Sequence, residues 1–548
     1  MTVASVPLPW KELPAPVRRL LLHGSVGREH LLSVARQLTS LAAVDAASRA
    51  SLLSLFQEVR LAAFAEAPLD GSLAMLLLAT QAPGGPTLPQ PLADVLKALA
   101  HFWAPPAQDD AWWNSANFDE RRNLTLQGLE AEPKNLFWKF SAWNLAWPQA
   151  DWALVDALLA EGAWPRTLAP VRQRFAAHAL LARGDVYGAL ASLNASALAS
   201  FVDDTGPRAE CLLVMGRADD ARQVLRQSLT RSPWRVSQWL RLHDLERGLH
   251  QALAPLPGPV AILLYTWNKA RELEETLASL AASDLTLGNG EARVWVLDNG
   301  STDDTPSVLA QWRDRLGERL TVLRLPVNVG APAARNWLLS LPEVRRCPYL
   351  VFLDDDVTLP PDWLLRLGAG LAACPEASVW GCRVVDEANP LVAQSVDLTP
   401  APSTDQPLAL SSLHQGQPDL GQFCYLRPCV SVTGCCHLLR EADLDKTGGF
   451  DIRFSPSQYD DLERDLRLGL AGGFAAYQGH LSVRHKRRSG AAAERTAADL
   501  GNATANTHKL ITKHSADDLL RVREQGEAIL ERDLLLKMER LGGLVFKA

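Results

Sequence analysis

No Cys-x-x-Cys pair occurs in this chain of 548 residues, although it contains eight cysteines. Two of them, Cys435 and Cys436, are adjacent, which is not a usual spacing for a zinc site or a disulfide framework. The cysteine pattern therefore argues against a zinc module and against a disulfide-stapled secreted fold. It favours a reducing compartment such as the cytoplasm.

Long apolar runs are also missing. The longest uncharged stretch, residues 71–93, contains Gly84, Gly85 and four prolines, which a membrane-spanning helix would not favour. The first residues have no basic region followed by an apolar core, so no secretory signal is expected. We predict a cytoplasmic protein without a transmembrane segment, and a peripheral contact with the inner membrane is the alternative left open.

An excess of positive charge is absent as well. The chain has 55 Lys and Arg residues against 62 Asp and Glu residues, a net charge of -7, and 47% hydrophobic residues. This balance is typical of a soluble globular protein and argues against a nucleic-acid partner. Arginine outnumbers lysine, and Ala and Leu are abundant, as in proteins from GC-rich bacterial genomes. The length alone predicts about three or four domains.

The first half of the chain has the periodicity of helices. Residues 14–251 place apolar side chains at spacings of three and four, with few alternating runs. Within them, residues 182–193 resemble residues 215–225 at an offset of 32 residues, close to the roughly 34 residues of a tetratricopeptide repeat. The matching positions are Gly184 and Gly216, Ala189 and Ala221, and Leu193 and Leu225. We therefore predict a degenerate helical solenoid that resembles such repeats, serving either as an acceptor-recruiting or assembly module or as a structural brace.

Tryptophans are concentrated in one part of this helical half. They suit either a platform for a sugar or peptide or the core of the domain, and we favour the core because tryptophan buries so much area. The cluster comprises Trp112, Trp113, Trp138, Trp143, Trp147, Trp152 and Trp164.

A Pro-rich linker, residues 254–259, separates this half from a different pattern. After it, apolar strand-like runs alternate with helical segments and short links, which predicts a parallel sheet with right-handed crossovers. The expected strands are 260–266, 292–297 and 320–325, and the expected helices are 269–282, 304–316 and 331–341.

The next expected strand ends in three acids. Residues 349–357 read Y-L-V-F-L-D-D-D-V, an apolar run that stops at Asp354, Asp355 and Asp356. The carboxyl edge of an open α/β sheet is where ligands bind. Three adjacent carboxylates repel one another, and hard divalent cations prefer oxygen ligands. We favour a metal site over the alternative that Asp356 merely helps to start the following helix, because a helix needs only one N-cap acceptor.

Motifs in this half resemble a family 2 glycosyltransferase of the GT-A fold. They begin with V-A-I-L-L-Y-T-W-N-K, V-W-V-L-D-N-G-S-T-D-D-T, N-V-G-A-P-A-A-R-N and the acidic strand itself. They continue through V-T-G-C-C-H-L-L-R, K-T-G-G-F-D and D-D-L-E-R-D-L-R to V-R-H. The resemblance covers roughly residues 260–486, and so many motifs in sequence order make it specific. The helical half lies outside it.

The resemblance implies a nucleotide-sugar site and assigns donor binding to Thr266, Asp298, Arg335, Asp354 and Asp355. A carboxylate such as Asp298 accepts the imide N–H of uracil or thymine, or amino hydrogens of guanine. Arg335 would pair with the base or the diphosphate. The residues alone leave two alternatives, a turn-forming role for Asp298 in D-N-G-S and an exposed helical position for Arg335.

The resemblance also implies that Asp354 and Asp356 hold Mn²⁺ or Mg²⁺ against the two phosphates of the donor. His485, after a short expected strand, resembles the third ligand of metal-dependent relatives, and a purely structural histidine is the alternative. Mixed nitrogen and oxygen ligands suit Mn²⁺ better than Ca²⁺.

An acidic pair at the start of a helix, usually Glu-Asp, supplies the general base in relatives. By position the base here is Asp461, with Asp460 completing the pair. The pair is Asp-Asp in this chain and the later acid is Glu463, whereas Arg467 keeps its expected place. The alternative is that these acids only stabilise the N-terminus of the helix.

These observations predict a GT-A domain of the α/β class, a Rossmann-like mixed sheet, preceded by an all-α domain and followed by a helical extension. The expected boundaries are 1–253 for the helical domain, 254–259 for the linker, 260–490 for the GT-A domain and 491–548 for the extension.

The predicted activity is a metal-dependent, inverting transfer of one sugar from a UDP-, GDP- or dTDP-sugar to a glycan, lipid-linked or protein acceptor (EC 2.4). A nucleotidyltransferase would need a Gly-rich loop after its first strand, and residues 265–270 contain no glycine. A processive polysaccharide synthase is disfavoured because no Q-x-x-R-W motif occurs. The remaining alternative is a non-catalytic sugar- or protein-binding scaffold, in which the helical domain would bind a protein partner.

Overall fold

The computed structural model describes residues 8–79, 88–115, 117–160, 162, 164–196, 198, 202–285, 287–288, 291–401, 408–411, 413–415, 418–486 and 497–545. Its internal contacts divide the chain into two units. Unit 1 is Met1–Leu242 with Leu413–Gln422 and Leu541–Ala548, and unit 2 is His243–Ser412 with Phe423–Arg540. Within the described residues, unit 1 is helical and every β-strand belongs to unit 2.

The described part of unit 1 is built of helices. They are α1 (Ala15–Leu22), α2 (Arg28–Val44), α3 (Arg49–Glu66), α4 (Gly71–Ala79), α5 (Gln90–His101), α6 (Phe118–Ala131), α7 (Leu136–Gln149), α8 (Trp152–Leu159), α9 (Ala169–Ala182), α10 (Val186–Ala195), α11 (Thr205–Val214), α12 (Ala218–Arg231) and α13 (Val236–Glu246), the last of which extends into unit 2. This confirms the prediction of a helical first half.

The two predicted repeat glycines occupy equivalent turns, one between α9 and α10 and the other between α11 and α12. Gly184 has φ +83° and Gly216 has φ +76°, the left-handed region that favours glycine after a helix. Each N–H donates to a backbone carbonyl three residues earlier, Leu181 and Leu213 respectively. The two helix pairs therefore share one turn geometry.

The tryptophan cluster lies mainly in the core of unit 1. Trp138, Trp143 and Trp147 are buried, and Trp113 is exposed. The rings of Trp143 and Trp147 stack at 5.0 Å, and Trp112 meets Phe137 edge to face at 5.0 Å. Core packing, the favoured interpretation, accounts for the three buried members.

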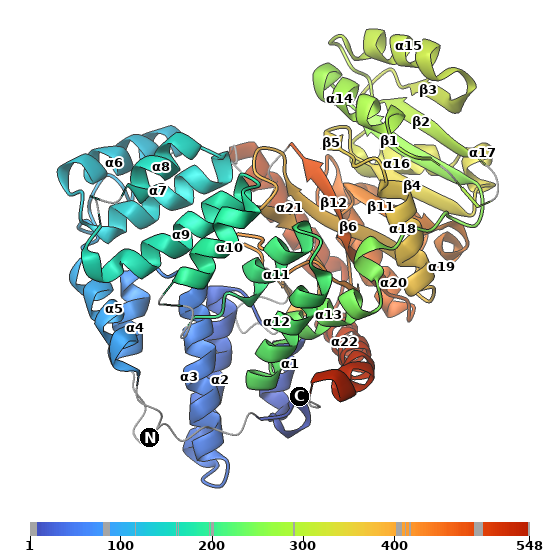
Figure 1. Cartoon of the computed structure of the whole chain (residues 1–548). Coiled ribbons are helices and arrows are strands. Elements are labelled where there is room, and N and C mark those ends of the chain that lie inside the picture. The colour runs from blue at the N-terminus through green and yellow to red at the C-terminus, as the bar shows by residue number, and fades with distance from the viewer. Residues whose placement is uncertain are drawn as a thin grey trace. The chain divides into compact units, whose positions relative to one another are not determined.

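Unit 2 is built on a mixed ten-stranded sheet with the order β10-β12-β6-β11-β4-β1-β2-β3, in which β5 also pairs with β12 and β7 with β6 (Figure 1). A separate pair is formed by β8 and β9. The strands are β1 (Val260–Thr266), β2 (Ala292–Asp298), β3 (Leu320–Arg324), β4 (Tyr349–Leu353), β5 (Val357–Thr358), β6 (Val379–Asp386), β7 (Ala393–Ser395), β8 (Pro400–Ala401), β9 (Ala409–Leu410), β10 (Leu426–Cys429), β11 (Cys436–Arg440) and β12 (Ala475–His485).

The helices of unit 2 cover both faces of this sheet. They are α14 (Ala270–Ala281), α15 (Thr305–Leu316), α16 (Ala331–Leu339), α17 (Pro342–Arg345), α18 (Trp363–Ala373), α19 (Leu444–Thr447), α20 (Asp460–Leu470), α21 (Ala497–Lys513) and α22 (Ala516–Val545), whose last residues belong to unit 1. Val351 and Leu353 of β4 join the core formed with α14, α15 and α18. Phe352 points to the other face, because side chains alternate along a strand, and its ring contacts Phe450 and Arg335 of α16.

The parallel sheet predicted from the alternating strands and helices is confirmed, because the neighbours β3, β2, β1 and β4 all run parallel. Strand β11 runs antiparallel to both β4 and β6. The chain leaves β6 at the carboxyl edge of the sheet and returns there after a long excursion, so β11 must enter from that edge and run back. The mixed sheet agrees with the predicted GT-A fold class.

Strand β12 differs from the prediction, because it has 11 residues where a short strand was expected. Its length follows from its partners, since different parts of it pair with β10, β6 and β5. It runs parallel to β6 and brings His485 level with Asp386 at the carboxyl edge.

The predicted C-terminal extension contains α21 and α22, and its expected start at residue 491 lies outside the described residues. Among the helices that the structure describes, none combines the length and the apolar character needed to cross a bilayer.

Candidate active site

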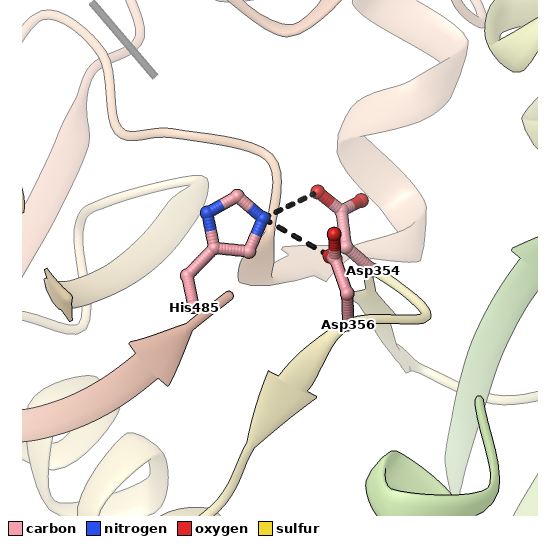
Figure 2. Close-up of side chains that lie close together, drawn as sticks. All are labelled: Asp354, Asp356 and His485. Atoms are coloured by element: carbon pink, nitrogen blue, oxygen red, sulfur yellow. Dashed lines mark ion pairs between the residues drawn. The ribbon is translucent and has the colours of Figure 1, made fainter. Parts of the chain in front are cut away.

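Three predicted metal ligands meet at the carboxyl edge of the sheet in unit 2. Asp354 and Asp356 follow β4, and His485 ends β12. One ligand atom from each lies within 4.8 Å of the other two. Figure 2 shows the imidazole ring facing both carboxylates, with its Nε2 atom 3.0 Å from Asp356 and 3.9 Å from Asp354. Two carboxylates and an imidazole form a donor set that fits Mn²⁺ or Mg²⁺.

The other ring nitrogen of His485 has its own partner. Nδ1 lies 2.9 Å from the amide oxygen of Gln394, whose Nε2 donates to the backbone carbonyl of His485 at 2.9 Å. A proton on Nδ1 would donate to this amide oxygen and leave Nε2 facing the carboxylates. Such a hydrogen bond orients metal-binding histidines in proteins.

Asp354 and Asp356 lie close enough for the charge of one to change the pKa of the other. Burial, together with the charge of Asp356, raises the pKa of Asp354 to about 6 even though Arg335 opposes the shift. Burial opposes ionisation of Asp356 too, but hydrogen bonding and charge from His485 and the charge of Lys269 hold its pKa well below the usual range. The same two carboxylates raise the pKa of His485 against the effect of its burial. A divalent cation between the carboxylates would remove this repulsion.

Lys269 supplies part of the balancing charge. Its ammonium group lies 2.8 Å from Asp355 and 2.9 Å from Asp356. Asp355 is thus held by a lysine, and its predicted donor-binding role stays a prediction. The alternative that Asp356 helps to start the next helix is wrong. Strand β5 intervenes, and α18 begins only after Asp362.

Arg335 links the acidic strand to the predicted catalytic helix. Its guanidinium is buried and lies 2.6 Å from Asp460 and 3.4 Å from Asp354. The rings of Tyr265 and Phe450 lie 5.4 Å and 5.1 Å from its central carbon. The alternative of an exposed helical arginine is therefore wrong. The guanidinium of Arg335 already pairs with two carboxylates, and its predicted contact with the donor stays a prediction.

Asp460 and Asp461 begin α20, as predicted from their position, and differ in environment. Asp460 is buried against Arg335, whereas Asp461 is only partly buried. One oxygen of Asp461 accepts the N–H of Gly434 at 2.7 Å, and the other accepts the N–H of Leu462 at 2.8 Å. A Cβ atom on Gly434 would lie 3.0 Å from both Arg335 and Asp461, so a larger residue here would have to displace these side chains by a few tenths of an ångström.

Strand β11 ties this helix to the acidic strand. The residue after Gly434, Cys435, accepts the backbone N–H of Asp354 at 2.9 Å. Gly434 and Cys435 thus bond to the carboxylate of Asp461 and to the backbone of Asp354, respectively. The predicted metal ligands and the predicted base belong to one connected site.

Glu463, two residues after Asp461, is buried and has two cationic neighbours and a histidine beside it. Arg467 lies 2.9 Å, Lys513 2.6 Å and His514 3.2 Å from its carboxylate. Burial raises the pKa of Glu463, but these hydrogen bonds outweigh burial and lower the pKa to about 2. Because the folded-state pKa is depressed, this carboxylate stabilises the fold above its unfolded pKa, and the stabilisation is lost as the pH falls toward about 2.

We expect Glu463→Gln to lower the free energy of unfolding at pH 7 by about 3 kcal/mol, because it removes a buried carboxylate and leaves the partly buried Arg467 and Lys513 without their charge partner. The difference in melting temperature between wild type and variant should shrink as the pH falls from about 4.5 toward 2. Thermal melts over this pH range measure both effects. Glu318→Gln, at an exposed position, is the matched control. A difference that stays constant with pH would contradict the ion-pair explanation.

The residues expected to bind the donor lie on β1, next to β4, and on β2, one strand further from the acids. Thr266 and Asp298 end β1 and β2 side by side in register, and both side chains are buried. One oxygen of Asp298 accepts the N–H of Ser301 at 2.8 Å, and the other lies 3.3 Å from Arg324. One oxygen of Asp298 therefore forms the turn, as the alternative interpretation expected. Next to Thr266, the ring of Trp267 is 49% exposed.

Four residues of the site escaped prediction. Lys269 and Trp267 lie inside the Y-T-W-N-K motif, so the signal was a cation and an aromatic directly after the first strand. Gly434 lies inside V-T-G-C-C-H, where a glycine before a strand was the signal. Gln394 has no signal in the sequence, because its role depends on the pairing of β7 with β6.

Residues 261–448 match the family model described as Glycosyl transferase family 2. This part of the chain is therefore a family 2 glycosyltransferase domain, which confirms the resemblance found in the motifs.

Relatives of known name match over parts of the chain. Validoxylamine A glucosyltransferase from Streptomyces hygroscopicus subsp. limoneus is 30% identical over 159 residues, which are 28% of this chain and 33% of the relative. The O-antigen biosynthesis protein RfbC from Myxococcus xanthus is 28% identical over 178 residues, 32% of this chain and 13% of the relative. The chain thus spans a third or less of the length of these relatives.

Among solved structures, the mannosyltransferase PcManGT from Pyrobaculum calidifontis, in complex with GDP-Man and Mn²⁺, matches at a TM-score of 0.36 and 16% identity. The match covers 61% of this chain and 87% of that one.

Proposed function

We propose that the chain is a metal-dependent glycosyltransferase that moves one sugar from a nucleotide sugar to an acceptor hydroxyl with inversion at the anomeric carbon. The observation that carries this proposal is the continuous link from Asp354 through Arg335 to Asp460, at distances of 3.4 Å and 2.6 Å. It supports one site in which phosphate-binding and base functions act together.

Asp354, Asp356 and His485 would hold Mn²⁺, or Mg²⁺ as the second choice. When bound, the cation would neutralise the charge that develops on the departing nucleoside diphosphate. Lys269 keeps Asp355 and Asp356 in place and offsets part of their charge before the donor arrives.

The proposed reaction is a single displacement. The acceptor oxygen forms a bond to the anomeric carbon while the bond from that carbon to the β-phosphate oxygen breaks, and its electron pair leaves with the nucleoside diphosphate. The proton of the acceptor hydroxyl passes to a carboxylate oxygen of Asp461. Two backbone N–H groups orient this carboxylate.

The base of the donor would bind near the end of β2. Asp298 offers a carboxylate to an imide or amino group, and the exposed ring of Trp267 offers a face for stacking. Arg335 would hold Asp354 and Asp460 in place. A contact with the diphosphate is its second proposed role.

We expect Asp298→Asn to weaken donor binding by about tenfold, because the turn to Ser301 survives while one acceptor becomes an amide donor. The Michaelis constant for the donor should rise and kcat should change little. Titrations with UDP, GDP and dTDP in the presence of Mn²⁺ measure the same loss directly. Asp304→Asn, at an exposed position six residues later, should leave binding unchanged. Equal effects of the two substitutions would contradict a donor-binding role for Asp298.

The experiment that tests the proposed function is a screen of the purified full chain against nucleotide sugars. UDP-glucose, UDP-galactose, UDP-N-acetylglucosamine, GDP-mannose and dTDP-rhamnose are incubated with Mn²⁺, and release of nucleoside diphosphate is measured. Release from at least one donor, abolished by EDTA, is expected. Binding of a sugar or nucleotide with no release from any donor would favour a non-catalytic scaffold.

Unit 1 would serve this reaction by recruiting the acceptor or a protein partner. The shared turn at Gly184 and Gly216 supports a repeat architecture of the tetratricopeptide kind, and such repeats build extended binding surfaces.

A further inference from the structure

The segment that leads into the catalytic helix has an unfavourable backbone. Gln458 and Tyr459, directly before Asp460, have φ of 80° and 68°, although neither is glycine. Two consecutive left-handed residues with Cβ atoms cost free energy and persist where the surroundings hold them. The helix nonetheless begins here, since the N–H of Glu463 donates to the carbonyl of Tyr459 at 2.8 Å. Something outside the segment must therefore stabilise the bend.

One side chain of α21 meets this requirement. Asn506 is 1% exposed, and its amide nitrogen lies 2.8 Å from the carbonyl of Ser457 and 3.0 Å from that of Gln458, with Phe454 at 3.3 Å. Its amide oxygen accepts from Lys509 at 2.9 Å. The amide thus holds the carbonyl groups of the bend itself, one of them belonging to a left-handed residue.

The rest of α21 reinforces this contact. Lys509 donates to the carbonyl of Arg453 at 2.7 Å, and Lys513 lies 2.6 Å from both Asp451 and Glu463. Leu510 packs in one apolar cluster with residues of the bend, of α20 and of α22, namely Phe454, Leu462, Leu466, Leu519 and Val522. On the other side of the bend, the carbonyl of Pro456 accepts the N–H of Ala331 of α16 at 2.8 Å.

We infer that α21 sets the direction of the N-terminus of α20, and that Asn506 is the positioning residue through which it orients Asp461. The inference rests on the proposed function, because Asn506 contacts no substrate and would act only through Asp461, the proposed base. Helix α21 lies beyond residues 260–486, over which the family motifs extend, so these motifs do not include it. In this chain the C-terminal helices are thus part of the catalytic apparatus.

The test compares Asn506→Ala with Thr507→Ala in the full chain. Thr507 is exposed on the same helix, and its hydroxyl bonds only to the carbonyl of Ala503 within that helix. At a temperature where both variants are folded, Asn506→Ala should lower kcat for nucleoside diphosphate release by roughly tenfold to a hundredfold. Its binding of UDP or GDP with Mn²⁺ should stay within about twofold of wild type, since donor binding does not depend on the bend. Thr507→Ala should change neither quantity.

A stability role alone would give a different result, namely a lower melting temperature with unchanged kcat below the transition, and that outcome overturns the inference. If Asn506→Ala does not fold, Asn506→Asp replaces it, because it keeps the size of the side chain, lacks both N–H donors and faces Lys509. The same loss of kcat is expected.

The double variant Asp461→Asn with Asn506→Ala separates this inference from the proposed function. If Asn506 acts through Asp461, the second substitution should cause no further loss once the base is gone. Additive losses would overturn the inference while leaving the base assignment intact. Full activity of the single variant Asp461→Asn would instead refute the base assignment itself.

Discussion

Replacing Asp356 with asparagine should reduce nucleotide-sugar turnover by roughly a thousandfold, because charge development on the diphosphate would lose its stabilisation by the metal. Of the two proposed carboxylate ligands, Asp356 lies closer to His485, at 3.0 Å, and its carboxylate also pairs with Lys269. An amide at this position keeps the shape of the side chain but removes the charge that binds the cation. We expect binding of Mn²⁺, measured by calorimetry, to fall with the activity.

The matched control is Asp362→Asn. Asp362 lies six residues later than Asp356, after β5, and its carboxylate pairs with Arg366 at 2.7 Å. It should leave Mn²⁺ binding and turnover near wild type. Melting temperatures of both variants check that the fold is intact.

Chelation gives an independent test of the same prediction. Excess EDTA should stop turnover, and adding Mn²⁺ should restore it more effectively than adding Mg²⁺, since one of the three ligands is an imidazole. Full turnover in EDTA would refute the metal role, whatever the effect of Asp356→Asn.

The acidic strand shows how far local sequence signals reach. The apolar run of β4 and the abrupt change to Asp354–Asp356 predicted both the strand and its functional edge, because burial and charge change at one point in the chain. The start of α20 at Asp460 was predicted for the same reason, as acids gather in a first turn. Such signals are local and need no knowledge of the fold.

Other parts of the site depend on pairings between distant segments. His485 reaches the acids because β12 pairs along most of its length and ends against β5, and nothing near Val483 predicts those partners. The motif containing Lys269 was identified, but its contacts with Asp355 and Asp356 join residues more than eighty positions apart. The sequence therefore indicated which residues lie at the carboxyl edge of the sheet better than which of them contact one another.

The role of α21 was beyond sequence reasoning for a related reason. A charged, helix-prone stretch predicts a helix and does not reveal which loop it supports. Asn506 is ordinary in sequence and acquires its role only because the bend at Gln458 and Tyr459 exposes carbonyl groups to it. Polar side chains that satisfy a bent segment can be recognised only once the bend is known.

Asp461→Asn should lower kcat by about a hundredfold or more, the loss expected when a general base is removed. The two backbone hydrogen bonds from Gly434 and Leu462 fix the orientation of this carboxylate at the start of α20. Binding of the donor nucleotide should change little, because Asp461 belongs to α20 and the donor-binding residues lie on other elements. Nucleoside diphosphate release measures kcat, and titration with UDP or GDP and Mn²⁺ measures binding.

Asp445→Asn is the control, because Asp445 is an exposed acid of the same unit that pairs only with Arg345, at 3.0 Å. It should leave both quantities unchanged. The stereochemistry of the product provides the second arm of this test. In a single displacement the acceptor attacks the face opposite the leaving diphosphate, so NMR of the freshly released sugar should show the inverted anomer. Retention of the donor's anomeric configuration would refute the single displacement even if Asp461 proved essential, since a retained configuration requires the reaction to proceed by another route.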